Sequence, residues 1–311
     1  MVDDGIDRRG FLRCMQWAGT GLLWTMAGGV PQSRLLGQSG NRAAAPGAKP
    51  AGEFSFVQIS DSHIGFARDA NPDVKGTLQV AIDKINGAGS PEFLIHTGDI
   101  TQNSKPDEFD NAAEILKSAK TNQAFYVPGE HDVMGGGQQY MDRYGKNTKG
   151  RGWYSFDHKG VHFIALVNVV EFKEGFGTLG DEQIEWLEDD VKGKSASTPI
   201  VVFAHVPLWT VYPKWGWGTA DSERALGYLK KFGSVTILNG HIHQTMQKVE
   251  GKVTFHTACS TAFPQPKPGE GTGPGPMKVP AEQLRSALGI TDVKFVRGEH
   301  SLAIVDEPLG S

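Results

Sequence analysis

The sequence FSFVQISDSH, residues 54–63, places an aspartate and a histidine directly after a short apolar run. The run Phe54–Ile59 has the length and content of a buried β-strand. Asp61 and His63 therefore stand just beyond the carboxyl end of a predicted strand. In open α/β sheets, ligands bind beyond the carboxyl ends of the strands. This position makes both residues candidates for a functional site.

Four more predicted strands end in the same way. Carboxylates and imidazoles follow them: Gly98-Asp99 after residues 93–96, Gly129-Glu130-His131-Asp132 after 125–127, His205 after 199–204, and Gly240-His241-Ile242-His243 after 235–238. The glycines at these junctions allow tight turns that aim the next side chains inward. Five separate strands thus deliver metal-binding groups to one edge.

A set of carboxylates and imidazoles suits transition metals such as zinc, iron or manganese. The two imidazoles of the turn His241-Ile242-His243 can bind two different ions, and a carboxylate with two oxygens can bridge those ions. This is the apparatus of a two-metal phosphoryl-transfer site, in which both ions polarise the phosphate and a hydroxide held between them attacks in line. The sequence therefore predicts a phosphohydrolase.

Helical patterns alternate with the predicted strands. Apolar residues recur at helical spacing in residues 73–86, 106–119, 181–191 and 222–231, and a short helix is expected at 281–287. Hairpins are predicted around the turns at 159–160 and 250–251, and two last strands at 293–296 and 301–305. The Pro- and Gly-rich residues 264–280 predict a long loop. The alternation predicts an α/β fold with added antiparallel strands.

Five sequence blocks, in this order, resemble the calcineurin-like metallophosphoesterases: Asp61-x-His63, Gly98-Asp99, Gly129-x-His131-Asp132, His205 and Gly240-His241-x-His243. The resemblance extends from about residue 54 to residue 243. It implies a β-sandwich of two mixed sheets flanked by α-helices. The chain looks most similar to bacterial cyclic-nucleotide and phosphodiesterase-type members. It lacks the tyrosine that marks purple acid phosphatases, because Gln102 occupies that position.

The resemblance also implies a role for each residue. The first metal would be held by Asp61, His63 and His243, and the second by His205 and His241, with Asp99 bridging them. His131 would contact the phosphate and assist the leaving group, and Asp132 would orient His131. The cofactor implied is a pair of transition-metal ions, drawn from iron, manganese and zinc. The partner implied is a small-molecule phosphoester substrate.

Glu130 departs from the family pattern, which has asparagine before the motif histidine. The carboxylate can still offer an oxygen to the second metal, or the side chain can turn aside and leave that metal weakly held. A bound Glu130 lowers the positive charge of the centre, which favours a phosphodiester over a more highly charged monoester. A trivalent iron would compensate instead. The alternatives are a phosphomonoesterase or nucleotidase, and a non-catalytic metal- or phosphate-binding relative.

The first 45 residues are predicted to be a targeting segment rather than part of the domain at 46–311. The sequence Asp7-Arg8-Arg9-Gly10-Phe11-Leu12 resembles a twin-arginine export signal, and Ala43-Ala44-Ala45 offers a small-residue cleavage site. The apolar run that follows the arginines is too short and weak for a membrane span. We expect the twin-arginine export machinery as a partner, and a periplasmic or secreted product. The alternative is a basic amphipathic anchor that is never cut.

The composition argues against a nucleic-acid-binding protein and against a disulfide-rich or cysteine-zinc protein. The 311 residues are 39% hydrophobic and 21% charged, with a net charge of -4, as is typical of a globular protein large enough to bury a core. No basic block follows the N-terminal segment, which argues against a nucleic acid as a stable partner. Cys14 and Cys259 cannot build a disulfide framework or a cysteine zinc site. The aromatic loop 208–217 either walls a substrate cleft or forms a local hydrophobic cluster.

Overall fold

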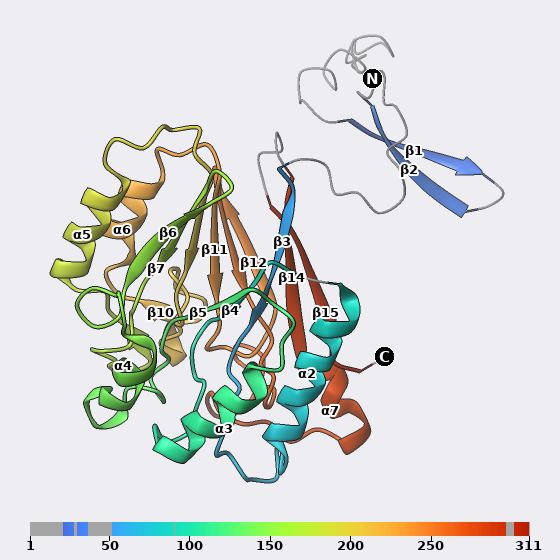
Figure 1. The fold of residues 1–311 in the computed structure, drawn as a ribbon. Helices are drawn as coiled ribbons and strands as arrows, with labels where there is room; N and C mark the ends of the chain where they lie inside the picture. The colour runs from blue at the N-terminus through green and yellow to red at the C-terminus, as the bar shows by residue number, and fades with distance from the viewer. Residues whose placement is uncertain (1–20, 28–29, 37–51, 90, 297–301, 311) are drawn as a thin grey trace, which may run out of the picture. The chain divides into compact units, whose positions relative to one another are not determined.

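The computed structural model describes residues 21–27, 30–36, 52–89, 91–296 and 302–310 (Figure 1). The chain divides into two units, Met1–Lys49 and Pro50–Ser311. In the first unit, β1 (Gly21–Ala27) pairs with β2 (Val30–Leu36) in an antiparallel hairpin. The predicted twin-arginine motif and cleavage site lie outside the described residues. No helix in the described part of the chain is long and apolar enough to cross a membrane.

The second unit contains two large mixed sheets. The five-stranded sheet has the order β15-β14-β3-β4-β5. Its strands are β3 (Phe54–Ile59), β4 (Phe93–His96), β5 (Gln123–Tyr126), β14 (Gly289–Phe295) and β15 (Ala303–Pro308). The strands β3, β4 and β5 are parallel, and β14 runs antiparallel to both β3 and β15. The parallel strands all point their carboxyl ends to the same edge.

The six-stranded sheet has the order β12-β13-β11-β9-β7-β6. Its strands are β6 (Tyr154–His158), β7 (Val161–Ala165), β9 (Ile200–Phe203), β11 (Val235–Asn239), β12 (Met246–Glu250) and β13 (Val253–Thr257). The four central strands are parallel, and β6 and β12 are antiparallel strands at the two edges. Both predicted hairpins are present in this sheet.

The two sheets pack face to face through an aromatic core. Phe56 stacks on Phe93 with ring centroids 5.0 Å apart, and Phe93 meets Phe163 of the opposite sheet edge-to-face at 5.4 Å. The outer face of the first sheet is covered by α2 (Val74–Ala88) and α3 (Pro106–Leu116), and that of the second by α5 (Asp181–Val191) and α6 (Ser222–Leu229) (Figure 1). The predicted α/β sandwich is therefore confirmed.

Several boundaries differ from those predicted from sequence. The helix predicted to end at residue 119 ends at Leu116, and the strand predicted at 125–127 is β5, which begins two residues earlier. Short elements were missed: η1 (Met134–Gly136), α4 (Gln138–Tyr144), β8 (Phe176–Gly177), η2 (Pro213–Trp215) and β10 (Gly218–Thr219). The helix α7 (Ala281–Ala287) follows the long loop as expected.

Candidate metal centre

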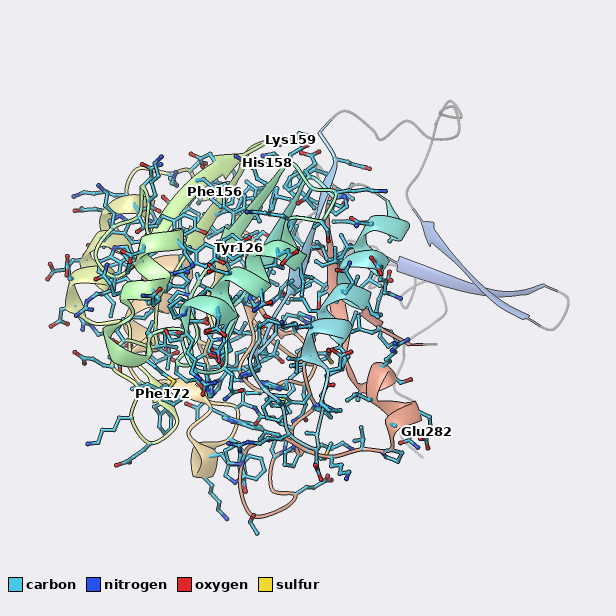
Figure 2. The ribbon with its side chains drawn as sticks, turned by 60° about the horizontal axis from the view of Figure 1, so that its bottom comes forward. Tyr126, Phe156, His158, Lys159, Phe172 and Glu282 are labelled. Atoms are coloured by element: carbon cyan, nitrogen blue, oxygen red, sulfur yellow. The ribbon has the colours of Figure 1, made fainter. Side chains whose placement is uncertain are left out.

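The seven predicted metal ligands converge at the carboxyl ends of strands from both sheets. They form overlapping groups in which one ligand atom of each residue lies within 4.8 Å of the others: Asp61-His63-His243, Glu130-His205-His241, Asp61-Asp99-His205 and, with His131, His63-Asp99-His131. Asp61 and His63 follow β3, Asp99 follows β4, and Glu130 follows β5. The remaining ligands follow β9 and β11. Figure 2 shows Phe172, whose ring contacts His241, at the opposite end of the molecule from His158.

The backbone at this edge adopts an unusual conformation. Five of the seven residues have positive φ angles, which few residues other than glycine adopt: Asp61 at 54°, His63 at 42°, Asp99 at 51°, His241 at 70° and His243 at 55°. Hydrogen bonds between neighbouring turns hold this conformation, such as that from the Asp61 amide to the Gly98 carbonyl at 3.0 Å. A strained backbone of this kind persists only where the surrounding contacts hold it in place, and it is found most often at functional sites.

The motif glycines are required by close packing around the carboxylates. A Cβ atom on Gly129 would lie 2.0 Å from Asp99 Oδ1, and one on Gly240 would lie 2.5 Å from Asp61 Oδ2. A Cβ atom on Gly98 would lie 2.6 Å from His205 Nδ1. Any side chain at these positions would displace a candidate ligand. The three glycines therefore leave the space that the candidate ligands need.

The first group has the geometry of a preformed ligand set. Asp61 Oδ1 lies 3.2 Å from His243 Nε2, and His243 Nε2 lies 3.2 Å from His63 Nε2. His243 Nδ1 lies 2.6 Å from the Phe263 carbonyl oxygen, to which its N–H donates. This bond leaves the Nε2 lone pair of His243 directed at the other ligands, as a carbonyl bonded to the far nitrogen of a metal-binding histidine does.

The second group contains Glu130. Its Oε2 lies 3.0 Å from His205 Nε2, and its Oε1 lies 3.1 Å from His241 Nδ1. His205 donates from Nδ1 to the Thr97 carbonyl oxygen at 2.7 Å, which fixes Nε2 as the atom that faces the centre. The Glu130 side chain thus points into the centre and is not turned aside.

Asp99 lies between the two groups. Its Oδ2 is 3.5 Å from His63 Nε2 in the first group and 3.4 Å from His205 Nε2 in the second. Its Oδ1 accepts a hydrogen bond of 3.0 Å from the backbone amide of His131. A carboxylate in this position can supply oxygen to both sites, as the resemblance to the family implied.

The electrostatics of the centre fit bound cations. Asp61 and Asp99 are buried, and among the described residues the ion-pair partners of both, and of Glu130, are histidines rather than lysine or arginine. Three carboxylates buried this close together are costly unless cations compensate their charge. Burial raises the pKa of Asp61, but the neighbouring imidazole of His243 outweighs it and holds that pKa well below its usual range. The donor set therefore fits two transition-metal ions.

The histidines respond to burial and to the carboxylates in different ways. Burial lowers the pKa of His63 to about 3, which keeps it neutral and able to bind metal. Burial also lowers the pKa of His205, but Asp99 and Glu130 outweigh that effect and raise it well above its usual value. Metal binding at His205 must therefore displace a proton, which is the usual linkage between metal affinity and pH.

Asp132 is linked to His131 through the backbone and not through the ring. Asp132 does not hydrogen-bond to the His131 ring; His131 Nδ1–H donates to the Gln102 carbonyl oxygen at 2.7 Å. The buried Asp132 carboxylate instead accepts bonds from the backbone amides of Ile100 at 3.0 Å, Thr101 at 2.8 Å and Gly129 at 2.9 Å, and from the Thr101 hydroxyl. Asp132 thus joins the loops after β4 and β5, and acts on His131 through the backbone.

Two features near the centre were not recognised from the sequence. In the sequence, Gln102 marks only the position where purple acid phosphatases have a tyrosine. In the structure, its backbone carbonyl fixes the His131 ring. Phe172 contacts the His241 ring edge-to-face at 5.6 Å. A backbone carbonyl and a loop phenylalanine carry no sequence signal of these roles. In the aromatic loop 208–217, the rings of Trp215 and Trp217 lie 4.9 Å apart and Trp209 packs on Phe255 at 5.1 Å, which favours the local-cluster interpretation.

Comparison with known proteins gives a consistent result. A probable cyclic nucleotide phosphodiesterase of Rhodococcus erythropolis is 24% identical over 230 residues, covering 70% of this chain and 73% of its own. A probable glycerophosphodiester phosphodiesterase of Arcobacter nitrofigilis is 27% identical over 225 residues, covering 66% and 77%. A solved dimetal phosphatase from Danio rerio shares the fold, with a TM-score of 0.59 and 13% identity over 82% of this chain and 96% of its own.

The family assignment rests on the whole region that builds the centre. The calcineurin-like phosphoesterase family matches residues 54–245, which run from the start of β3 past the last candidate ligand. The motifs, the two-sheet fold and the converging ligands agree with this match. The protein belongs to the calcineurin-like phosphoesterases and is a metal-dependent phosphoesterase.

Proposed function

We propose that this protein is an exported phosphodiesterase that works with two metal ions. The observation that carries the proposal is the convergence of seven candidate ligand side chains around Asp99, at the carboxyl ends of five strands from both sheets. The arrangement would place one ion among Asp61, Asp99, His63 and His243, and the other among Asp99, Glu130, His205 and His241. When bound, the ions polarise the phosphoryl group and make a water molecule more acidic.

The protein side chains would position the substrate and supply a proton to the leaving oxygen. His131 lies in the same group as His63 and Asp99, and its Nδ1 is engaged by the Gln102 carbonyl. Its Nε2 atom is therefore the one that can contact the phosphoryl oxygens and donate a proton to the leaving oxygen. Because Asp132 ties together the loops that carry Asp99 and His131, it sets the distance between these two groups.

The charge of the centre supports a diester substrate. Two divalent ions bring four positive charges, and Asp61, Asp99 and Glu130 bring three negative ones, so one positive charge remains. This is less than in a centre with asparagine at position 130, and attraction scales with the charge of the ligand. A diester monoanion needs less attraction than a monoester dianion. The curated relatives named as phosphodiesterases support the same substrate class.

Export is supported by the sequence alone. The segment at residues 1–45 has paired arginines, an apolar run and a small-residue cleavage site. The twin-arginine route carries folded proteins, which suits an enzyme that binds its metals before it leaves the cytoplasm. We infer a periplasmic or secreted product.

The substrate class can be tested with chromogenic esters. The purified full chain, loaded with Mn(II), should hydrolyse bis-(para-nitrophenyl) phosphate with a higher kcat/KM than para-nitrophenyl phosphate. Metal analysis of the same sample should give two ions per chain. Preference for the monoester would contradict the diester proposal, and inactivity of a fully loaded sample on both esters would contradict catalysis.

A further inference from the structure

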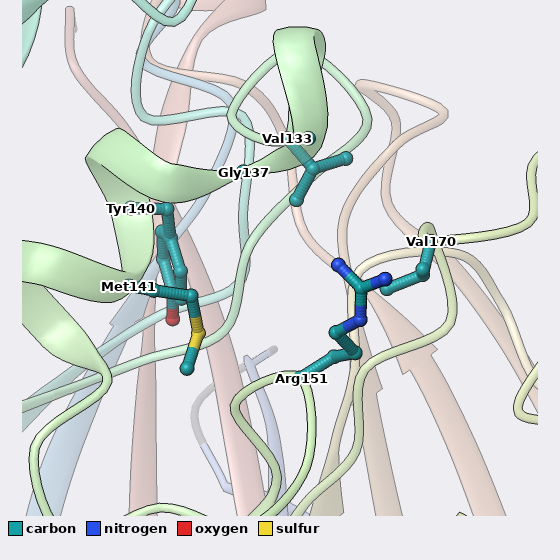
Figure 3. A pocket seen from close by; sticks show the side chains of 7 residues that line it. Val133, Gly137, Tyr140, Met141, Arg151 and Val170 are labelled. Atoms are coloured by element: carbon teal, nitrogen blue, oxygen red, sulfur yellow. The ribbon is translucent and has the colours of Figure 1, made fainter.

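A hollow opens beside the metal centre, in the segment that follows β5 (Figure 3). Its volume is about 220 Å³, enough for roughly seven water molecules or a small organic group. The walls include Val133, Tyr140, Met141 and Val170, which are apolar or aromatic, and the one lining residue with a charged side chain is Arg151. Pockets that are mostly apolar with a single polar anchor are typical of small-molecule sites.

The lining of the hollow is linked to the metal centre by chain neighbours and by one apolar cluster. Val133 stands two residues after His131, and Val170 two residues before Phe172, whose ring contacts His241. Val133 and Phe172 both pack on one apolar cluster, formed by Trp153, Val167, Val169 and Val206, and Val206 directly follows His205. A substrate whose phosphoryl group lies on the metals can therefore extend into this hollow.

The rim of the hollow exposes apolar surface. Met134, next to Val133, is 53% exposed, and Val170 is 41% exposed. These are two of the four exposed large hydrophobic residues in the described part of the chain. Val170, which lines the hollow, and Met134, which is next to the lining residue Val133, thus leave apolar surface open to solvent.

Arg151 lies in a tight turn that is held by backbone hydrogen bonds. Gly150 and Gly152 flank it with φ angles of 46° and 114°, and Lys149 and Trp153 exchange backbone hydrogen bonds of 2.7 Å and 3.1 Å across the turn. The Trp153 ring packs so close to Gly150 that an added Cβ would lie 1.9 Å from it. The backbone that carries Arg151 is therefore held in place before any ligand binds.

The guanidinium group of Arg151 has no protein partner. Among the described residues, no ion pair or hydrogen bond involves its side chain, and Figure 3 shows it directed into the hollow, toward the space between Val133 and Val170. An arginine presents several N–H donors in a fixed fork that suits carboxylate and phosphate groups. An unpaired arginine over apolar walls is thus suited to a ligand that combines an apolar body with an anionic end.

We propose that this hollow is the subsite for the alcohol substituent of the phosphoester, and that Arg151 selects substituents with a short apolar chain ending in an anionic group. The inference rests on the proposed function only in that a phosphoryl group must bind the metals. Arg151 is a specificity-determining residue that recognises the far end of the substrate and takes no part in the chemistry at phosphorus.

The test measures binding of two ligands that the enzyme cannot hydrolyse. Butylphosphonate and 4-phosphonobutanoate have carbon chains of equal length, and only the second ends in a carboxylate. We expect the Mn(II)-loaded full chain to bind 4-phosphonobutanoate about tenfold more tightly, because a charge-assisted hydrogen bond forms with Arg151. Arg151→Ala should remove most of this preference, and Arg151→Lys should keep part of it.

A matched control separates the subsite from the general positive field of the metals. Lys149→Ala removes one positive charge from the same turn, at an exposed residue outside the hollow, and should keep the tenfold preference. Equal binding of the two phosphonates by the wild type would overturn the inference, as would an equal loss in the Lys149 and Arg151 variants. Failure of 4-phosphonobutanoate to bind would overturn it too.

The same samples distinguish this inference from the proposed function. A wild type that shows the carboxylate preference but hydrolyses monoesters only would refute the phosphodiesterase proposal and support the subsite. A wild type that hydrolyses diesters without any carboxylate preference would refute the subsite and support the phosphodiesterase. Unchanged metal content and unfolding temperature in Arg151→Ala would show that the variant is folded and loaded.

Discussion

Glu130 is a departure from the family pattern of asparagine before the motif histidine. Its two oxygens lie within 3.1 Å of His205 Nε2 and His241 Nδ1, so it occupies the place of a ligand. Burial raises the pKa of Glu130, but His241 and His205 outweigh it and hold that pKa well below its usual value. The side chain is therefore a carboxylate, and it brings a negative charge where the family has a neutral amide.

Replacing that carboxylate should shift substrate preference. In Glu130→Asn, the centre gains one positive charge, and the ratio of monoester to diester kcat/KM should rise by about fivefold or more, because one added charge a few ångströms away contributes on the order of 1 kcal/mol or more. Glu130→Gln, which keeps the length of the side chain, should shift the ratio in the same direction. A ratio, metal content and pH profile that match the wild type would mean that Glu130 does not touch the metals.

The roles of Asp99 and His131 can be separated by metal analysis. Asp99→Ala should lose activity and lower the metal content at both sites, since its Oδ2 lies about equally far from a histidine of each group. His131→Ala should keep both metals and lose roughly a hundredfold to ten-thousandfold in kcat, the range for a general acid. Retained metal in the first variant, or lost metal in the second, would contradict these assignments.

At the scale of the elements, the turns after the strands position the ligands. Gly129→Ala would put a methyl group 2.0 Å from Asp99 Oδ1, so we expect Asp99 to move and metal affinity to fall. Gly87→Ala is the matched control. Gly87 lies in α2 with open space around its Cα atom, and alanine there should stabilise the helix by about 0.5–1 kcal/mol. Metal titration and thermal unfolding of both variants measure these effects, and wild-type metal affinity in Gly129→Ala would disprove the steric argument.

A buried imidazole joins α5 to the β6–β7 hairpin. His162 lies between two carboxylates, with Nδ1 2.7 Å from Asp157 Oδ1 and Nε2 2.7 Å from Asp190 Oδ2. Ser155 donates a further hydrogen bond of 2.6 Å to Asp190 Oδ1. Burial raises the pKa of Asp190, but the bonds from His162 and Ser155 outweigh it and lower that pKa below the usual 3.8. The link is therefore strongest while Asp190 is ionised.

The lowered pKa gives a stability prediction with a defined sign. Because the folded-state pKa of Asp190 is below its unfolded value, its ionised form stabilises the fold above that value, and the stabilisation is lost as the pH falls through the folded-state pKa. Asp190→Asn should lower the free energy of unfolding by about 1 kcal/mol near neutral pH, and by less once the pH is below the folded-state pKa. The exposed neighbour provides the control, since Asp189→Asn should change stability little at either pH. An equal loss at both pH values would exclude the charged link.

The sequence predicts elements well where burial dominates. The strands Phe54–Ile59 and Phe93–His96 and the helix Asp181–Val191 lie where their apolar patterns place them. Helix α4 was missed because it is short and buries only Tyr140. The strands β8 and β10 pair with each other across distant segments, so no local pattern marks them. The candidate ligands follow from their motifs, whereas the support of His131 by the Gln102 carbonyl depends on tertiary contacts.

At the scale of the whole molecule, the metal centre depends on both sheets at once. Asp61, Asp99 and Glu130 follow strands of one sheet, and His205, His241 and His243 follow strands of the other. Neither sheet alone carries a complete set for either metal. For the proposed pair of ions, the sandwich must be folded before both can be held, so we expect metal loading and folding to be coupled in one unit, Pro50–Ser311.

This coupling bears on the proposed export of the protein. A folded, metal-loaded domain requires an export route that accepts folded proteins, and the arginine pair at residues 8 and 9 is the sequence feature that would select the twin-arginine route. Replacing both with lysine keeps the charge but removes the motif, and should leave the precursor in the cytoplasm. Fractionation of cells followed by immunoblotting measures the distribution of the protein between cytoplasm and periplasm.

The matched control, Arg42→Lys, makes the same exchange in the same segment but outside the pair, and should be exported normally. Normal export of the double lysine variant would exclude the twin-arginine signal. The alternative, a basic amphipathic anchor that is never cut, would then be the interpretation of residues 1–45.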